Sequence, residues 1–419
     1  MKLISPRILI LLSFIIWLLV YVVSPIQYIT KPTNQALLYL FFCFASFFIG
    51  TFYTHLFFIT KKNQVKFKPK KEEYKNLKFL RIVSFIGLIG LIFRYYDLLF
   101  VKDFISYGSV TAFRLHGSII NDTTFVGIGS SILYPFSIIA IVVSFHINEK
   151  KIIDKVLIVL NILLFVIYIY LLGGRTSLTL IIIMVLISII FKKKKLSHVF
   201  NLKRIVFIVM LFLLFFAYSN LILINRLEEM GFNIQDHLNY MQNERRFIVK
   251  DWFNNILSND DVFTGGVKYT YISLVHYVLH GYYQFFLLFE HFNSSNLGYG
   301  AYQFYPVFKL GNFIGIEVVD YYELMSKLET QGVYTTFFGP LYADFGFGGL
   351  TFLFMFLFGF VSQLFYKKAL NGELFSTLFY SYLGSVLIHS SFINMIQSGM
   401  GLYVFVSILF SALLLKLMS

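Results

Sequence analysis

The feature that most constrains this chain is a series of long apolar stretches that are almost free of charge. Many of them run for about 18 residues or more, which is the length that a helix needs to cross the roughly 30 Å hydrocarbon core of a bilayer. Charged residues make up only 13% of the 419 residues, about half of what a soluble domain carries. The sequence therefore predicts an all-α, polytopic membrane protein.

Ten such stretches are expected to span the membrane, and they divide the chain into three regions. Residues 1–224 are predicted to form a bundle of seven spans, residues 225–346 a large loop, and residues 347–419 the last three spans. No small-residue cleavage site follows the first span, so we interpret it as an uncleaved anchor. The predicted spans are 8–28, 36–60, 82–100, 125–147, 156–172, 178–191, 205–224, 350–366, 374–392 and 400–415.

The distribution of charge predicts how these spans are oriented. Residues 225–346 contain seven Lys and Arg and 13 Asp and Glu, a net charge of −6, whereas the rest of the chain holds 28 basic and eight acidic residues, a net charge of +20. Basic loops remain on the cytoplasmic side of a membrane. We therefore expect both termini in the cytoplasm and the acidic loop outside. The net charge of +14 then reflects topology, and we expect no nucleic-acid partner.

The large loop is too long to lack structure, so it is expected to contain helices of its own. One piece of it, residues 267–292, is apolar enough to be mistaken for a span. A span there would invert every later loop and place Lys367 and Lys368 outside. We therefore interpret this piece as an interfacial or re-entrant helix, which also suits the polar side chains of His276, His280 and Gln284.

Arg175 is the most informative single residue, because a guanidinium in hydrocarbon costs several kcal/mol and must sit at the interface or in a polar cavity. It follows Gly173 and Gly174, which allow the backbone to approach a ligand closely. Thr176 and Ser177 are expected to cap the next helix. An arginine beside a helix N-terminus is suited to binding phosphate. The alternative is a tight turn whose arginine reaches lipid headgroups.

Four further arginines are predicted on the outer face, where the remaining basic residues are lysines. If they converge, they could clamp a diphosphate through paired contacts that lysine cannot copy. The alternative is solvated charge or ion pairing with glutamates of the same loop. The four are Arg114, Arg226, Arg245 and Arg246.

His276 and His280 lie four residues apart, so they are expected to stack on one face of a helix. Either could act as the general base toward a sugar hydroxyl. The alternative is an amphipathic helix that places its histidines among lipid headgroups. No Cys/His cluster or H-E-x-x-H spacing accompanies them, so no metal site is expected.

The stretch Gly332–Leu350 is expected to form a shaped turn beneath the site, because its glycines and Pro340 disfavour regular structure. Its aromatic residues Tyr334 and Tyr342 could contact sugar rings, or they could belong to the interfacial belt of tyrosines. Asp344 in the same stretch is either an acid/base residue or a helix N-cap. Elsewhere, Arg94 and Asp97 are three residues apart on a predicted span and could neutralise each other.

In three segments the chain resembles bacterial oligosaccharide repeat-unit polymerases, the Wzy-type O-antigen and capsule polymerases. One segment is YTTFFGPLYADFGFGG before the eighth predicted span, and another is GGRTSL between the fifth and sixth. The last is YTYISLVHYVLHGYYQFF followed by YGAYQFYPVFKLG in the large loop. Nothing between Gly231 and Phe263 matches, which leaves the roles of Arg245 and Arg246 open.

This resemblance implies a GT-C-like membrane glycosyltransferase of the bacterial inner membrane. It implies a donor glycan on undecaprenyl diphosphate and an acceptor that is a second lipid-linked repeat unit, with no metal or nucleotide-sugar cofactor. The residues expected to carry this chemistry are Arg175 and Arg226, as cations for the departing diphosphate, and His276, His280 or Asp344, as the proton acceptor. A chain-length regulator and a flippase are possible protein partners. The open alternatives are an O-antigen ligase, a flippase or exporter of the same lipid-linked sugars, and a structural scaffold subunit.

Overall fold

The computed structural model describes residues 2–57, 70–109, 112–113, 124–172, 175–193, 221, 231, 233–244, 246–256, 262–293, 296–313, 315–316 and 335–418. Within these residues, eight helices are long and apolar enough to cross a membrane. The chain is therefore an all-α polytopic membrane protein, as the sequence predicts. The predicted seventh span, 205–224, lies almost wholly outside the described residues.

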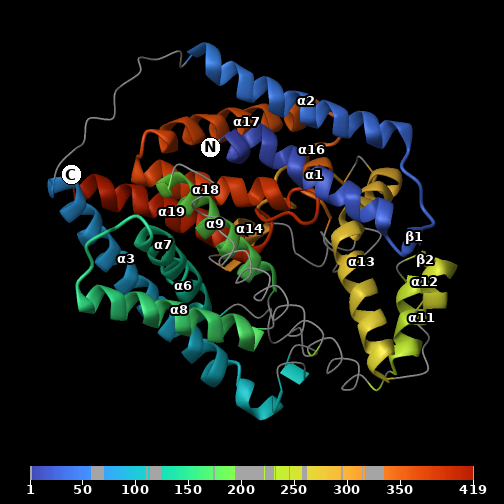
Figure 1. The fold of residues 1–419 in the computed structure, drawn as a ribbon, viewed down its shortest axis with the longest axis horizontal. Coiled ribbons are helices and arrows are strands. Elements are labelled where there is room, and N and C mark those ends of the chain that lie inside the picture. Colours follow the sequence, from blue (N-terminus) through green and yellow to red (C-terminus); the bar gives the residue numbers. More distant parts are fainter. Residues whose placement is uncertain are drawn as a thin grey trace.

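The spanning helices run in alternating directions across Figure 1. Most of them begin and end within about five residues of the predicted limits, but the third begins at Lys70, well before the predicted start at residue 82. Six of them are α1 (Pro6–Val23), α2 (Asn34–Phe57), α3 (Lys70–Tyr96), α8 (Ile152–Leu172), α9 (Arg175–Lys193) and α17 (Gly349–Leu370). The others are α19 (Gly399–Leu417) and the pair α6 (Phe125–Leu133) and α7 (Phe136–Ser144). The ninth predicted span is the shorter apolar helix α18 (Leu374–His389).

The predicted fourth span is one run of apolar sequence but two helices. α6 ends at Leu133 and α7 begins at Phe136, with Tyr134 and Pro135 between them. Proline has no backbone N–H, and its ring clashes with the preceding turn, so the ladder of helical hydrogen bonds is interrupted here. The predicted span is therefore present as a candidate span, Phe125–Ser144, with an interruption at Tyr134 and Pro135.

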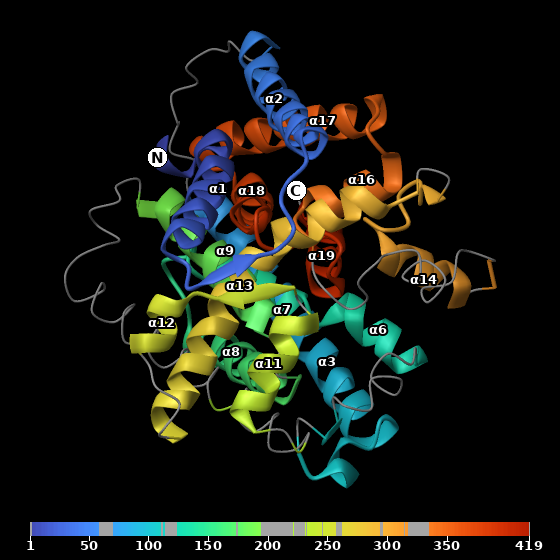
Figure 2. The same ribbon diagram turned by 90° about the vertical axis from the view of Figure 1, so that its right-hand side faces the viewer.

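Helices α2 and α17 lie side by side in both Figure 1 and Figure 2, apart from most of the bundle. Two glycines allow this close approach. A β-carbon at Gly50 would collide with the carbonyl oxygen of Phe356, and one at Gly359 would collide with that of Phe47. Small residues at a membrane helix interface bring the two backbones together and so gain dispersion contacts.

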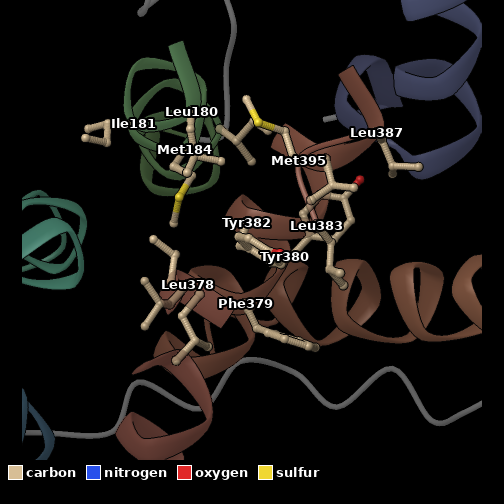
Figure 3. Packing of buried hydrophobic residues seen from close by; sticks show 14 of the residues in the cluster. Leu180, Ile181, Met184, Leu378, Phe379, Tyr380, Tyr382, Leu383, Leu387 and Met395 are labelled. Atoms are coloured by element: carbon tan, nitrogen blue, oxygen red, sulfur yellow. The ribbon is translucent and has the colours of Figure 1, made fainter. Parts of the chain in front are cut away.

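Helices α9 and α18 pack together at the centre of the molecule. Figure 3 shows Leu180 and Met184 of α9 facing Leu378 and Tyr382 of α18. All four side chains are buried. This packing fixes the start of α9 relative to the end of α18.

A small sheet that the sequence did not predict joins the beginning of the chain to the large loop. Strand β1 (Ile26–Tyr28) follows α1, and it pairs antiparallel with β2 (Phe247–Val249). With α11 (Ile234–Glu244) and α12 (Asp251–Ile256), the two strands form what we call the sheet end of the molecule, at the right of Figure 1. A separate apolar cluster, formed with α13, supports it.

Helix α13 (Val262–His291) runs crosswise to α1 and α18 in Figure 1. It is not among the eight candidate spans of the described chain, in agreement with the prediction. It does not lie on a surface as an interfacial helix would, because most of its length from Gly265 onward is buried. It packs against α1, α11, β1 and α16.

The stretch predicted to be a shaped turn contains a helix, α16 (Phe338–Phe345), which follows α14 (Tyr305–Phe313) in the described chain. Pro340 lies in the first turn of α16, where no partner exists for a backbone N–H and proline is tolerated. The turn comes later, at Gly346, whose φ of 63° suits glycine. The expectation of a non-helical turn through Gly339 and Pro340 was therefore wrong.

Candidate functional site

The start of α9 is the first component of the candidate site. The helix begins at Arg175, so the partial positive charge of its first turn lies beside this residue. Thr176 and Ser177 were expected to cap the helix, but they lie within its first turn. The side chain of Arg175 and the two preceding glycines lie outside the described residues.

A contact between two hydroxyl groups joins the start of α9 to α13. Thr176 Oγ1 lies 3.0 Å from the hydroxyl oxygen of Tyr277. Tyr277 sits between His276 and His280 along the chain, and its ring centroid lies 5.6 Å from that of His280. The structure therefore brings together two segments that the sequence singled out separately, about 100 residues apart.

The two histidines stack on α13 as predicted. Their ring centroids are 5.3 Å apart, and the angle between the planes is 25°. Both side chains are buried, with 9% of His276 and 4% of His280 exposed. The alternative that they lie among lipid headgroups does not fit this burial.

The hydrogen bonds of the two histidines differ. Nδ1 of His280 lies 3.0 Å from the carbonyl oxygen of His276. A carbonyl can only accept, so Nδ1 carries a proton, and in the neutral tautomer Nε2 is then the acceptor nitrogen. His276 instead uses Nδ1 to contact the Tyr28 hydroxyl at 2.8 Å, which ties it to strand β1.

His389, at the end of α18, is a further histidine of this region that the sequence analysis did not single out. Its Nδ1 lies 2.8 Å from the Ser385 carbonyl oxygen, and its Nε2 lies 3.1 Å from Thr179 Oγ1 on α9. Thr179 Oγ1 also lies 2.9 Å from the Thr176 carbonyl oxygen. The sequence does contain a signal for His389, because a histidine within an apolar span is rare and needs a polar partner.

Gly281 allows α13 to approach the end of α18. A β-carbon at this position would lie 2.7 Å from the carbonyl oxygen of Phe392. The Gly281 carbonyl also accepts a hydrogen bond of 3.3 Å from the Thr336 N–H. The backbone beside His280 is therefore held against two other segments of the chain, which limits how far this histidine can move.

Asp344 is fully buried, but its surroundings are those of a structural residue. Its two carboxylate oxygens accept hydrogen bonds from the backbone N–H groups of Tyr302 at 2.9 Å and Gln303 at 2.7 Å. Burial raises the pKa of this carboxyl to about 6, while N–H groups of Gly300, Tyr302 and Gln303 act in the opposite direction. The position is not the predicted helix N-cap, because Asp344 lies near the end of α16 and Gly348 precedes α17.

Asp344 of α16 packs near the end of α13, whereas the two histidines lie in the middle of that helix. Ala343, the neighbour of Asp344, belongs to a small apolar cluster with Leu288 and Phe292. Leu288 is eight residues beyond His280, which corresponds to about 12 Å along a helix. Asp344 is connected instead to Gln303, whose side-chain oxygen accepts a hydrogen bond of 2.8 Å from Asn394.

Tyr342 and Arg246 are the other described residues of the predicted site. The ring of Tyr342 stacks on Phe289 with centroids 4.4 Å apart, so at least one of its faces is occupied by protein. Arg246 is exposed at the sheet end, directly before β2, with a φ of 51°. Neither residue takes part in the contact between Thr176 and Tyr277. The predicted residues Arg114, Arg226, Arg245 and Tyr334 lie outside the described residues.

The charged pair predicted on the third span forms. Arg94 Nη1 lies 3.8 Å from Asp97 Oδ2, and the guanidinium also donates from Nε to the Tyr168 hydroxyl at 2.6 Å. Lys102 lies 4.0 Å from the same carboxylate oxygen. The partners of Arg94 are protein groups, so we interpret this cluster as a structural one.

Comparisons with known proteins add no relative. No protein-family model, no curated protein and no solved structure matches this chain. Within the described part of the chain, no group of three or more His, Cys, Asp and Glu side chains is placed to hold a metal ion. Support for a function therefore comes from the contacts between α9 and α13 and from the sequence itself.

Proposed function

We propose that the protein is a membrane glycosyltransferase that polymerises oligosaccharide repeat units carried on undecaprenyl diphosphate. The products would be O-antigen or capsular polysaccharide. The resemblance of three sequence segments to repeat-unit polymerases supports this proposal. The charge distribution supports an active site on the outer face of the bacterial inner membrane, with both termini in the cytoplasm.

One observation carries the proposal: the 3.0 Å contact between Thr176 and Tyr277. It joins the helix start at Arg175 to the helix segment that carries His276 and His280. A diphosphate leaving group needs positive charge, and an acceptor hydroxyl needs a base. The contact brings an arginine-bearing helix N-terminus and a pair of histidines into one region, which is what this chemistry requires.

The proposed reaction transfers the growing glycan from one lipid to another. The bond between the donor's anomeric carbon and the diphosphate oxygen breaks, and a bond forms between that carbon and the acceptor hydroxyl oxygen. His280 is our candidate for the base that takes up the hydroxyl proton, because its Nδ1 contact to the His276 carbonyl makes Nε2 the acceptor nitrogen of the neutral tautomer. Arg175 and the first turn of α9 would stabilise the charge on the departing diphosphate. Asp344 is assigned no proton transfer, since backbone N–H groups already bind its carboxylate.

The direct test replaces Arg175 in cells that depend on this protein for surface polysaccharide. We expect Arg175→Ala and Arg175→Lys to be inserted normally but to give no glycan ladder on a gel, because lysine cannot make paired contacts to a diphosphate. Arg246→Ala is the matched control, and its ladder should persist. A normal ladder from Arg175→Ala would remove Arg175 from the mechanism.

Deletion of the whole protein separates this function from its rivals. A repeat-unit polymerase leaves a single repeat unit attached to the surface acceptor when it is deleted. An O-antigen ligase leaves none attached, while polymer accumulates on the lipid carrier. A flippase leaves the repeat units inside the cell. We expect the first of these results.

A further inference from the structure

The two-stranded sheet has one face that packs on the protein and one that does not. Ile26 pairs with Val249 and Tyr28 with Phe247, and this side of the sheet contributes to the apolar cluster on α13. Side chains alternate along a strand, so the pair between them, Gln27 and Ile248, points the other way. Ile248 is 55% exposed, and Ile29 just beyond β1 is 64% exposed.

This outer face lies directly after a candidate membrane span whose last turns are apolar and exposed. The last turns of α1 expose Leu19, Val22 and Val23. Only Ser24 and Pro25 separate α1 from β1. Strand β1 therefore follows a candidate membrane span almost directly along the chain, with no charged residue between them.

An exposed tryptophan lies close to the same strands. Trp252 is in the first turn of α12, three residues after β2, and 47% of it is exposed. Lys250, between them, turns back to the protein, where its ammonium donates to the Ser24 carbonyl oxygen at 2.8 Å. Tryptophan is enriched where a membrane meets water, because it combines a large apolar ring with an N–H donor.

We propose that the surface formed by Ile29, Ile248 and Trp252 rests in the headgroup layer of the bilayer. The partner is thus a lipid surface and not a soluble protein. The position of β1 almost directly after the candidate membrane span α1 identifies this partner. Tyr28, which holds His276 from the opposite side of the same sheet, then lies at the boundary between lipid and water. This inference does not depend on the enzymatic proposal.

The chain is well suited to a fluorescence test, because it contains only two tryptophans. Trp17→Phe leaves Trp252 as the sole tryptophan, and Trp252→Phe leaves Trp17. Trp17 lies six residues before the end of α1, or about 9 Å deeper along a helix. Each variant is reconstituted into phosphatidylcholine vesicles with lipids brominated either near the headgroup or near the chain end.

We expect shallow bromines to quench Trp252 about twofold more strongly than deep bromines, as for an interfacial ring. Trp17 should respond more to deep bromines. Quenching of Trp252 by aqueous iodide with no effect of bromine would overturn the proposal, because the ring would face water. Resistance to both quenchers would also overturn it, because a second copy or another protein would then cover the surface. The difference in quenching between wild type and Trp252→Phe also gives the quenching of Trp252, without a substitution at Trp17.

Discussion

His280 and Asp344 are both buried ionisable residues near α13, yet the structure uses them in opposite ways. Both oxygens of the Asp344 carboxylate are occupied by backbone N–H groups. His280 uses Nδ1 to contact the carbonyl oxygen of His276, which fixes the orientation of the ring and makes Nε2 the acceptor nitrogen of the neutral tautomer. The comparison shows that burial of an ionisable group does not by itself identify a catalytic residue. What matters is which atoms the surrounding backbone already occupies.

The largest expected effect tests the catalytic side of this comparison. Replacing His280 by alanine should slow chain extension about 100-fold or more, which is the usual contribution of a positioned base. His280→Gln should not restore activity, because an amide cannot take up the proton. The matched control is His291→Ala, which removes an exposed histidine from the end of the same helix. The measurement is the rate of polymer formation by purified protein in vesicles.

The second-largest expected effect concerns stability and tests the structural role of Asp344. Asp344→Ala should lower the free energy of unfolding by on the order of 3 kcal/mol, because buried backbone N–H groups lose their acceptor. Thermal unfolding in detergent measures this loss. Glu290→Ala is the matched control, since Glu290 is exposed and should change stability by less than about 0.5 kcal/mol. An Asp344→Ala protein with unchanged stability but no activity would break the comparison.

The pH dependence of stability provides a second test of the role of Asp344. The pKa of Asp344 in the folded protein, about 6, lies above its ordinary value of 3.8, so the folded state binds this proton more tightly than the unfolded state. The contribution of Asp344 to stability is then greatest below about pH 4, falls as pH rises to about 6, and is constant above that. Thermal unfolding from pH 4 to pH 7 should show this fall in wild type. If the stability of Asp344→Ala falls with pH as steeply as that of wild type, Asp344 is not the group whose titration causes the fall.

The smallest effect concerns His276. Tyr28→Phe removes a single hydrogen bond of 2.8 Å and should reduce stability by about 1 kcal/mol. Activity should fall only slightly, because His276 is not the proposed base. Tyr21→Phe, an exposed position on α1, is the control. A loss of activity as large as that of His280→Ala would exchange the roles of the two histidines.

The spanning helices could be predicted from sequence because hydrocarbon imposes one strong condition, that every backbone group be satisfied within the helix. Eight of the ten predicted spans correspond to candidate spans of the described chain. The break at Pro135 and the helix at Phe338–Phe345 could not be predicted in the same way. In both, the outcome depends on the place of one proline within a turn, which apolar periodicity does not report.

Long-range pairing was the main feature that the sequence could not reveal. The strands at Ile26 and Phe247 are three residues long, and neither has a pattern that identifies its partner. The role of Asp344 was hidden for the same reason, because its partners are backbone N–H groups about 40 residues away, and the contact of His389 with Thr179 likewise joins distant segments. The stacking of His276 on His280 was predictable, since it depends only on a spacing of four within one helix.

The pairing of β1 with β2 has a consequence for biosynthesis. Tyr28 leaves the ribosome early, but its partner His276 follows 248 residues later. Most of the spans must already be inserted before this contact can form, and contacts between residues so distant in sequence form slowly. The contact between Tyr28 and His276 is therefore expected to form late, after the large loop has been synthesised and has closed back onto the beginning of the chain.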